Sequence, residues 1–250
     1  MSENQKKVWI TGASSGIGKA VAEKFAKEGW RVAVSARRKE ILDDMAENHN
    51  IFSYPLDVVN EESCFKTFQK IISEFTEIDL CIFCSGTYDP KKEKEIDLKQ
   101  NRFVMDVNYF GVLNCVKTVE KYFKDKKRGH ISIVSSIAGY RGLPNSSGYG
   151  PSKAALNNFA ESIFFDFKKF NVRISIISPG FIKTPLTDKN DFPMPFLRST
   201  EFAAKKIYVG LTKSNSFEIH FPKQLTLILK FLRILPYKIY LFLIYKLYKR

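Results

Sequence analysis

Tyr149 and Lys153 stand four residues apart in the stretch SSGYGPSK, residues 146 to 153. Four residues make about one turn of a helix, so in a helix that begins here both side chains leave the same face. A free phenol has a pKa of about 10, and a neighbouring ammonium lowers it by favouring the phenolate. Such a pair can exchange a proton with a substrate oxygen. Taken alone, however, the pair would suit an ordinary surface contact.

A glycine-rich stretch, TGASSGIG, follows the first apolar run and carries Gly12, Gly16 and Gly18. Glycines at such a turn let backbone N–H groups approach a pyrophosphate at the N-terminus of the next helix. The alternative is a plain tight turn. The position after an expected strand and before an expected helix favours a dinucleotide site.

The second apolar run ends in SARRKE, where a carboxylate would hold the adenosine ribose hydroxyls of NAD. Ala36 occupies that position, and Arg37 and Arg38 follow it. A guanidinium pairs with a phosphate through two parallel hydrogen bonds, so we expect a preference for NADP(H). The alternative is two solvent-facing arginines.

Apolar runs alternate with amphipathic stretches along the chain, which predicts a parallel sheet with helices on both faces. The expected strands are 7–11, 31–36, 51–58, 79–86, 130–136, 173–180 and 217–221. The expected helices are near 17–28, 39–48, 61–76, 99–124, 150–170 and 200–212. We therefore predict one domain over residues 1–222, followed by a basic amphipathic tail over 223–250.

The motifs together resemble the short-chain dehydrogenase/reductase family, from about residue 6 to 221. They are TGxxxGxG, a serine thirteen residues before the tyrosine, YxxxK and a later PG motif. The resemblance implies a single Rossmann-type doubly wound α/β fold of about seven strands, and a dimer or tetramer. It also implies that Ser136, Tyr149 and Lys153 are catalytic, with Asn108 completing a tetrad by holding a water that feeds protons towards Lys153.

The same resemblance implies an extended cofactor site. Asp57 and Val58 match the family's adenine-binding pair, and Ile182 and Thr184 follow the PG motif at the nicotinamide end. Cys84 in FCSG replaces an asparagine that is thought to brace the sheet in the family. The full expected set is Gly12, Ser14, Ser15, Gly16, Ile17, Gly18, Arg37, Arg38, Asp57, Val58, Gly86, Tyr149, Lys153, Pro179, Gly180, Ile182 and Thr184.

Two cysteines, Cys81 and Cys84, form a C-x-x-C pattern inside an expected strand. Residues three apart on a strand point to opposite faces, and no second Cys or His pair completes a zinc set, so we expect core residues and no metal site. Beyond Thr184, a proline-broken apolar loop resembles a lid. Its Phe192, Met194 and Phe196 would either face an apolar substrate or pack on the domain.

The chain carries a net charge of +14, and residues 219–250 hold seven basic and no acidic residues. No basic run interleaves with stacking aromatics in a nucleic-acid-binding motif, so we expect no nucleic-acid partner. Pro236 divides the tail into two basic amphipathic segments, and no apolar run reaches the ~20 residues of a spanning helix. We expect the tail to attach to an anionic membrane surface. The alternative is a pair of dimer or lid helices.

The sequence thus predicts an NADP(H)-dependent enzyme that reduces a ketone or aldehyde of a lipophilic substrate, or reversibly oxidises an alcohol. The polar N-terminus has no signal-like apolar stretch. We therefore expect a cytoplasmic protein that associates peripherally with a membrane. Two alternatives remain open. One is a soluble reductase of small carbonyl compounds with an oligomerising tail, and the other is a membrane-attached NADP(H)-binding sensor or scaffold with little turnover.

Overall fold

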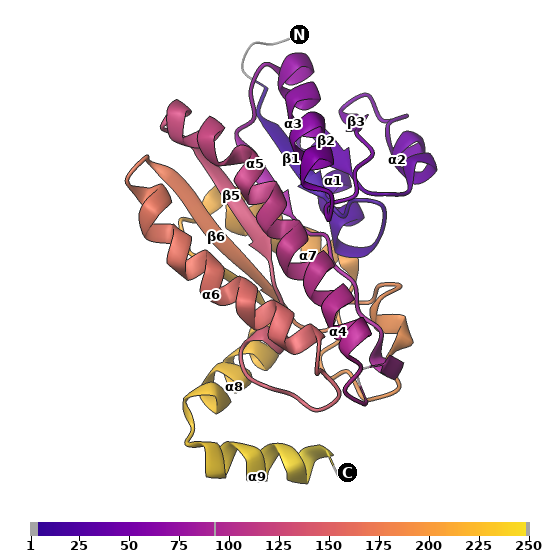
Figure 1. Cartoon of the computed structure of the whole chain (residues 1–250), viewed down its shortest axis with the longest axis vertical. Helices are drawn as coiled ribbons and strands as arrows, with labels where there is room; N and C mark the ends of the chain where they lie inside the picture. Colours follow the sequence, from indigo (N-terminus) through magenta and orange to yellow (C-terminus); the bar gives the residue numbers. More distant parts are fainter. Residues whose placement is uncertain (1–4, 93, 249–250) are drawn as a thin grey trace.

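Seven parallel strands form the centre of the computed structural model, which describes residues 5–92 and 94–248. The strand order is β3-β2-β1-β4-β5-β6-β7, and each neighbouring pair is parallel (Figure 1). The strands are β1 (Lys7–Thr11), β2 (Arg31–Ser35), β3 (Ile51–Ser53), β4 (Leu80–Phe83), β5 (Gly129–Val134), β6 (Val172–Pro179) and β7 (Glu218–Phe221). The strand order starts with β1 inside the sheet, runs through β2 to β3 at one edge, and then from β4 to β7 at the other edge. The reversal between β1 and β4 opens a crevice beyond their carboxyl ends.

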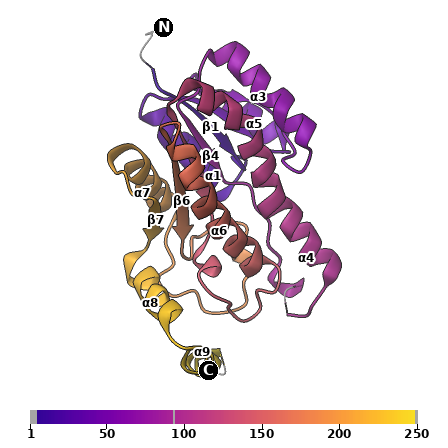
Figure 2. The same cartoon turned by 60° about the vertical axis from the view of Figure 1, so that its left-hand side comes forward.

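Helices cover both faces of the sheet (Figures 1 and 2). One face carries α1 (Gly16–Lys27), α2 (Lys39–Met45) and α7 (Thr200–Lys213), and the other carries α3 (Glu61–Phe75), α5 (Gly111–Lys126) and α6 (Tyr149–Lys168). Neighbouring strand residues feed opposite cores, so Val8 and Ile10 lie in one cluster and Trp9 in the other. The predicted doubly wound α/β fold is confirmed.

The single helix expected over residues 99–124 is wrong in detail. The structure has α4 (Leu98–Met105), a π-helical segment η2 (Asp106–Phe110) and then α5. A π-segment widens one turn without breaking the apolar pattern, so periodicity does not reveal it. Asn108 lies in the middle of this segment.

The expected strand over residues 51–58 is also shorter, because Pro55 has no N–H to donate to a ladder. The chain nevertheless continues beside β2. The N–H of Tyr54 donates to Val34 O and that of Leu56 to Ala36 O, both at 2.9 Å. This irregular extension carries Asp57 to the end of the sheet where the strands finish.

Two helices, α8 (Lys223–Ile234) and α9 (Tyr237–Tyr248), form the tail on either side of Pro236 as expected. They lie at the lower end of the molecule in Figures 1 and 2, the end towards which β5 and β6 run. Within the described residues, no helix has the length and apolar character needed to cross a bilayer. Lys249 and Arg250, the last two basic residues of the second segment, lie outside the described part of the chain.

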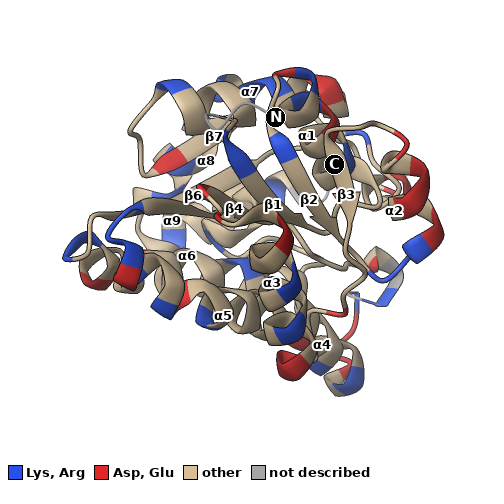
Figure 3. Cartoon of the chain, turned by 90° about the horizontal axis from the view of Figure 1, so that it is seen from above, with Lys and Arg blue, Asp and Glu red and all other residues tan. Residues whose placement is uncertain are grey.

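Three short helices complete the fold: η1 (Pro90–Lys92), η3 (Ile137–Gly139) and η4 (Thr187–Lys189). Lys and Arg residues occur on helices around the sheet and are interspersed with Asp and Glu residues (Figure 3). Many of them form ion pairs one helical turn apart, such as Lys39 with Asp43 and Lys121 with Asp125. The body of the molecule therefore carries both signs of charge side by side.

A row of buried polar side chains links β5 and β6. A ring nitrogen of His130 lies 2.8 Å from Ser175 Oγ, and the Ser175 hydroxyl donates to Ser132 Oγ at 3.1 Å. Burial lowers the pKa of His130 to about 3, and the nearby Arg173 charge acts in the same direction. In the unfolded chain the imidazole recovers its ordinary pKa near 6.5. Between these values the unfolded state binds the extra proton, so stability falls as the pH falls.

We predict that the wild-type chain loses about 2 kcal/mol of unfolding free energy through His130 between pH 7 and pH 5. His130→Gln should flatten this part of the pH dependence, whatever its effect at neutral pH. Urea unfolding at the two pH values measures the difference. The exposed His49 offers the control, because His49→Gln should keep the wild-type slope. Equal slopes for the two variants would contradict the assignment.

Candidate active site

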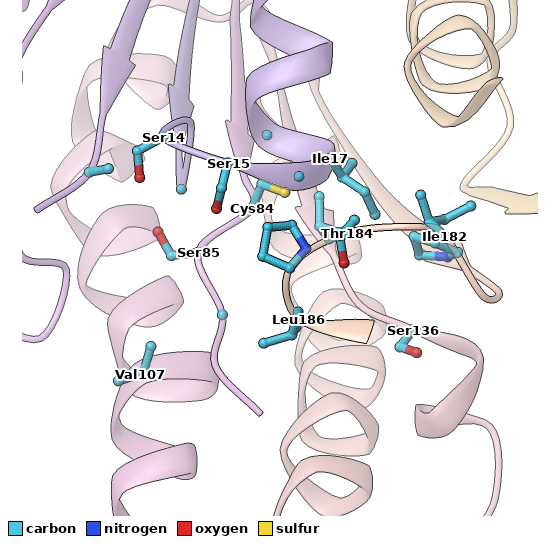
Figure 4. Close-up of a pocket in the computed structure, with 18 of the residues that line it drawn as sticks. Ser14, Ser15, Ile17, Cys84, Ser85, Val107, Ser136, Ile182, Thr184 and Leu186 are labelled. Carbon is cyan, nitrogen blue, oxygen red and sulfur yellow. The ribbon is translucent and has the colours of Figure 1, made fainter. Parts of the chain in front are cut away.

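A pocket of about 460 Å³ opens at the carboxyl ends of the strands (Figure 4). It brings together residues from the turn after β1, the ends of β2, β4, β5 and β6, and the start of α6. Every residue of the expected cofactor set lines it, and so does Ser136. Asn108 does not, although its neighbour Val107 does.

The glycine turn is too crowded for side chains. Gly12 has a φ of +68°, and a Cβ on it would lie 2.8 Å from the backbone of Cys84. A Cβ on Gly18 would lie 2.3 Å from Gly12 O. Ser15 begins α1 without a side-chain cap, and the first turn of α1 holds no acidic residue. Its backbone N–H groups are thus available to an anion, which fits a pyrophosphate.

The end of β2 presents positive charge and hydroxyl groups to the same pocket. The Arg38 guanidinium donates to Ser14 Oγ from Nη2 at 2.9 Å and from Nε at 3.2 Å. Arg37 is exposed on the pocket wall beside Ala36. In the neighbouring segment, Asp57 Oδ1 accepts the N–H of Val59 at 3.3 Å. The set suits a nucleotide that carries an extra phosphate on its ribose.

Tyr149 is the first residue of α6, and Lys153 lies one turn further on, as the spacing predicts. The Lys153 side chain is 3 % exposed, and its Nζ donates to Val134 O at 3.0 Å. The same Nζ lies 5.7 Å from the centre of the Tyr149 ring. Burial lowers the pKa of Lys153 to about 8, and the Cys84 thiol acts in the opposite direction. The ammonium is therefore still the main form at neutral pH.

Ser136 lies two residues after β5 and is the N-cap of η3, where its Oγ accepts the N–H of Ala138 at 3.2 Å. Figure 4 shows its side chain at the wall of the pocket. Tyr88 is an unforeseen neighbour, because its ring packs against Tyr149 with the ring centres 4.9 Å apart. It lies in an irregular loop after β4, so no periodicity in the sequence could have pointed to it.

Asn108 is fully buried behind the pocket, and its amide group joins three elements. Its Oδ1 accepts the N–H of Thr87 at 2.7 Å, and its Nδ2 donates to Thr87 O and to Ser152 Oγ, each at 3.0 Å. The side chain thus positions the loop after β4 against the first turn of α6. With both amide atoms engaged in these bonds, the role of Asn108 in holding a water stays a prediction.

The two cysteines of the C-x-x-C pattern point to opposite faces. Cys81 is completely buried, and burial raises its thiol pKa. Cys84 packs against the edge of the core on one face of the sheet and also lines the pocket, and burial raises its pKa to about 11. Its backbone N–H donates to Thr11 Oγ1 at 3.2 Å. This bond links the ends of β4 and β1 where the family's asparagine is missing.

The loop after β6 covers the pocket with residues other than those singled out from the sequence. Pro185, Leu186, Thr187 and Lys189 line the pocket. Phe192 instead packs against Phe181, with the ring centres 6.1 Å apart. Met194 Sδ accepts a bond from Asn190, and Phe196 is exposed with a φ of +59°. The arrangement favours the packing alternative for Phe192 and Met194.

We predict that Asn108→Ala lowers the free energy of unfolding by about 2–4 kcal/mol, because it leaves buried partners at Thr87 and Ser152 unsatisfied. Urea denaturation measures the loss. Asn158→Ala is the matched control, since Asn158 is exposed on α6 and should tolerate alanine. A cost no larger than that of the control would contradict the positioning role.

Comparisons with known proteins agree with this geometry. The model of the short chain dehydrogenase family matches residues 6–193. An uncharacterized oxidoreductase from Myxococcus xanthus (strain DK1622) is 34% identical over 232 residues, which are 91% of each chain. The 11-beta-hydroxysteroid dehydrogenase A of Sesamum indicum is 32% identical over 189 residues, which are 73% of this chain and 54% of the relative.

Among solved structures, a short chain dehydrogenase from Burkholderia cenocepacia J2315 in complex with NADP superimposes with a TM-score of 0.80. It shares 25% sequence identity, and the match covers 94% of this chain and 95% of that one. The sequence match, the parallel sheet and the placing of the motif residues around one pocket lead to the same conclusion. The chain belongs to the short chain dehydrogenase family of oxidoreductases.

Proposed function

We propose that this protein uses NADPH to reduce a ketone or aldehyde of a lipophilic substrate to the alcohol, with Tyr149 as the proton donor. The observation that carries the proposal is the Lys153 ammonium, buried one helical turn from the Tyr149 ring in a pocket that begins at the glycine turn. Solvent hardly reaches this ammonium, so Lys153 is not one of the exposed lysines that serve solubility.

Each of the three side chains has its own role in the proposed reduction. Bound NADPH would supply the hydride that is added to the carbonyl carbon. The Ser136 hydroxyl donates a hydrogen bond to the carbonyl oxygen before negative charge develops there. The Tyr149 O–H gives its proton to that oxygen, and the C–H and O–H bonds of the alcohol are then complete. The Lys153 ammonium stabilises the phenolate that remains on Tyr149. The reverse sequence oxidises an alcohol.

The preference for NADP(H) rests on the end of β2. Arg37 and Arg38 line the pocket there, Arg38 is oriented by Ser14, and Ala36 stands where a carboxylate would repel a phosphate. The solved relative in complex with NADP supports the same choice. Because NADPH pools generally favour reduction, we propose reduction as the working direction.

The proposal of a lipophilic substrate rests on apolar residues in the pocket lining. Val107 and Leu186 both line the pocket (Figure 4), and so does Pro185, which precedes Leu186. The relative from Sesamum indicum, named for a hydroxysteroid, supports a substrate of this polarity. A ketone or aldehyde on a largely hydrocarbon skeleton fits these contacts.

We predict that Tyr149→Phe lowers the rate of NADPH-dependent carbonyl reduction by at least about 100-fold, because it removes the proton donor but keeps the ring. NADPH oxidation against a series of carbonyls of increasing chain length measures the effect, and turnover of the wild type should rise with lipophilicity. Tyr109→Phe is the control, since Tyr109 packs against Phe159 away from the pocket lining. Undiminished turnover in Tyr149→Phe would refute the assignment. Tight NADPH binding by a wild type without turnover would favour a binding protein.

We further predict that Arg37→Ala combined with Arg38→Ala weakens NADPH binding by about 10- to 100-fold, at about 1.4 kcal/mol per factor of ten, while NADH binding changes little. Fluorescence titration of each nucleotide gives the two dissociation constants. Arg102→Ala, at an exposed position on α4, should change neither. A wild type that binds NADH more tightly than NADPH would overturn the cofactor choice.

A further inference from the structure

Helix α8 packs on the protein with a mixed face, in which Leu225 and Leu229 contact apolar residues and polar side chains bind beside them. Lys230 Nζ forms an ion pair with Glu218 of β7, and the Tyr140 hydroxyl donates to the other oxygen of that carboxylate at 2.5 Å. Thr226 is fully buried, and its Oγ1 lies 2.7 Å from His220 Nδ1. The polar side chains that an isolated amphipathic helix would turn to water thus fasten α8 to the sheet edge.

The opposite face of α8 is apolar and exposed. Leu227, Ile228, Phe231 and Ile234 are all more than half exposed, and Ile234 reaches 76%. At about 100° per residue, the four side chains fall within an arc of about 120°. A helix of a globular protein normally buries such an arc. Here the arc faces away from the body.

Helix α9 is also rich in exposed apolar residues. Its exposed apolar side chains are Tyr237, Ile239, Leu241, Phe242, Tyr245 and Leu247. Of the 21 large apolar side chains that are exposed among the described residues, ten lie between positions 227 and 247. So dense an apolar surface marks an interaction site rather than ordinary solvent exposure.

Exposed cations accompany the apolar side chains. Arg233, Lys238 and Lys246 are exposed on α8 and α9, and the sequence has no acidic residue from Ile219 to its last residue. Two copies meeting through this surface would bring these cations together without acidic partners in the tail. An anionic bilayer surface offers an apolar layer for the side chains and negative head groups for the cations.

We propose that α8 and α9 together form a lipid-docking surface that lies flat on an anionic bilayer. Each helix has 12 residues, which is about 18 Å, so each lies in the interface rather than across the membrane. Docking requires neither NADPH nor turnover, so it stands independently of the proposed reaction. It would place a lipophilic substrate beside the protein in the phase where that substrate dissolves.

Arg141 fixes this surface relative to the active site. Its Nη1 donates to the carbonyls of Leu232, Arg233 and Leu235 at 3.0, 3.1 and 2.7 Å, which caps the end of α8. Its guanidinium also packs on the rings of Tyr237 and Tyr240 of α9, 4.5 and 4.0 Å from their centres.

Arg141 is also close to the active site along the chain, since it lies two residues after η3, whose N-cap is Ser136. The Tyr240 hydroxyl adds a bond to Gly142 O at 2.6 Å. The loop between Ser136 and Tyr149 is thereby joined to the junction of α8 and α9. A docked tail therefore holds the carboxyl ends of the strands, and the pocket there, at a fixed orientation to the bilayer.

Vesicle flotation of the full chain tests the proposal, with phosphatidylcholine vesicles that contain or lack phosphatidylglycerol. We expect the wild type to float with the anionic vesicles. Phe231→Ser combined with Phe242→Ser should weaken this binding at least about tenfold, because both rings leave the apolar layer. Phe65→Ser is the matched control, as Phe65 is 54% exposed on α3 and Phe231 is 60% exposed. Melting curves should show that all variants remain folded.

Three results would overturn the proposal. The first is a wild type that floats with neither kind of vesicle. The second is a double variant that floats as well as the wild type, which would mean adsorption by charge alone. The third is a concentration-dependent dimer that the double variant abolishes, without vesicle binding, which would assign the surface to a second copy of the chain.

Discussion

A buried ammonium sets the arrangement of the whole site. Removing the charge of Lys153 from water costs free energy, and its bond to Val134 O offsets part of that cost. The surrounding backbone leaves little freedom, since a Cβ on Gly139 would lie 2.7 Å from the Lys153 carbonyl. The Ser135 hydroxyl donates to that same carbonyl at 3.0 Å. Strand β5, η3 and α6 therefore form one unit built around a single side chain.

The glycine turn and the lysine meet through β4. Gly12 packs on the backbone of Cys84, and two residues later Gly86 lies beside both Asn108 and Lys153, each within 3.6 Å of where its Cβ would be. Asn108 in turn holds Ser152 at the start of α6. The nucleotide half and the catalytic half of the pocket are thus joined through main chain and buried amides. Flexible surface side chains play no part in this connection.

Local spacing in the sequence was enough to predict most of the residues that line the pocket. The four-residue interval between Tyr149 and Lys153 and the glycines after the first strand are short-range features, and parallel topology then brings them to the same edge. The π-segment around Asn108, the Tyr88 ring and the Val134 carbonyl escaped prediction. Each depends on long-range packing or on a main-chain atom, which leaves no pattern in residue type. The tail shows the same limit, because its amphipathic pattern predicts two helices and does not say which face of α8 meets the protein.

Residues outside the tail determine which face of α8 packs on the protein. Glu218 and His220 in β7 attract Lys230 and Thr226, so the edge strand determines which side of α8 is presented to the surroundings. The consequence concerns inheritance by recombination. A tail joined to another domain at residue 223 would lose the partners that orient it, whereas a segment beginning with β7 would carry them along. Such a segment would still lack Tyr140 and Arg141, so the tail keeps its full orientation only where the loop after β5 comes with it.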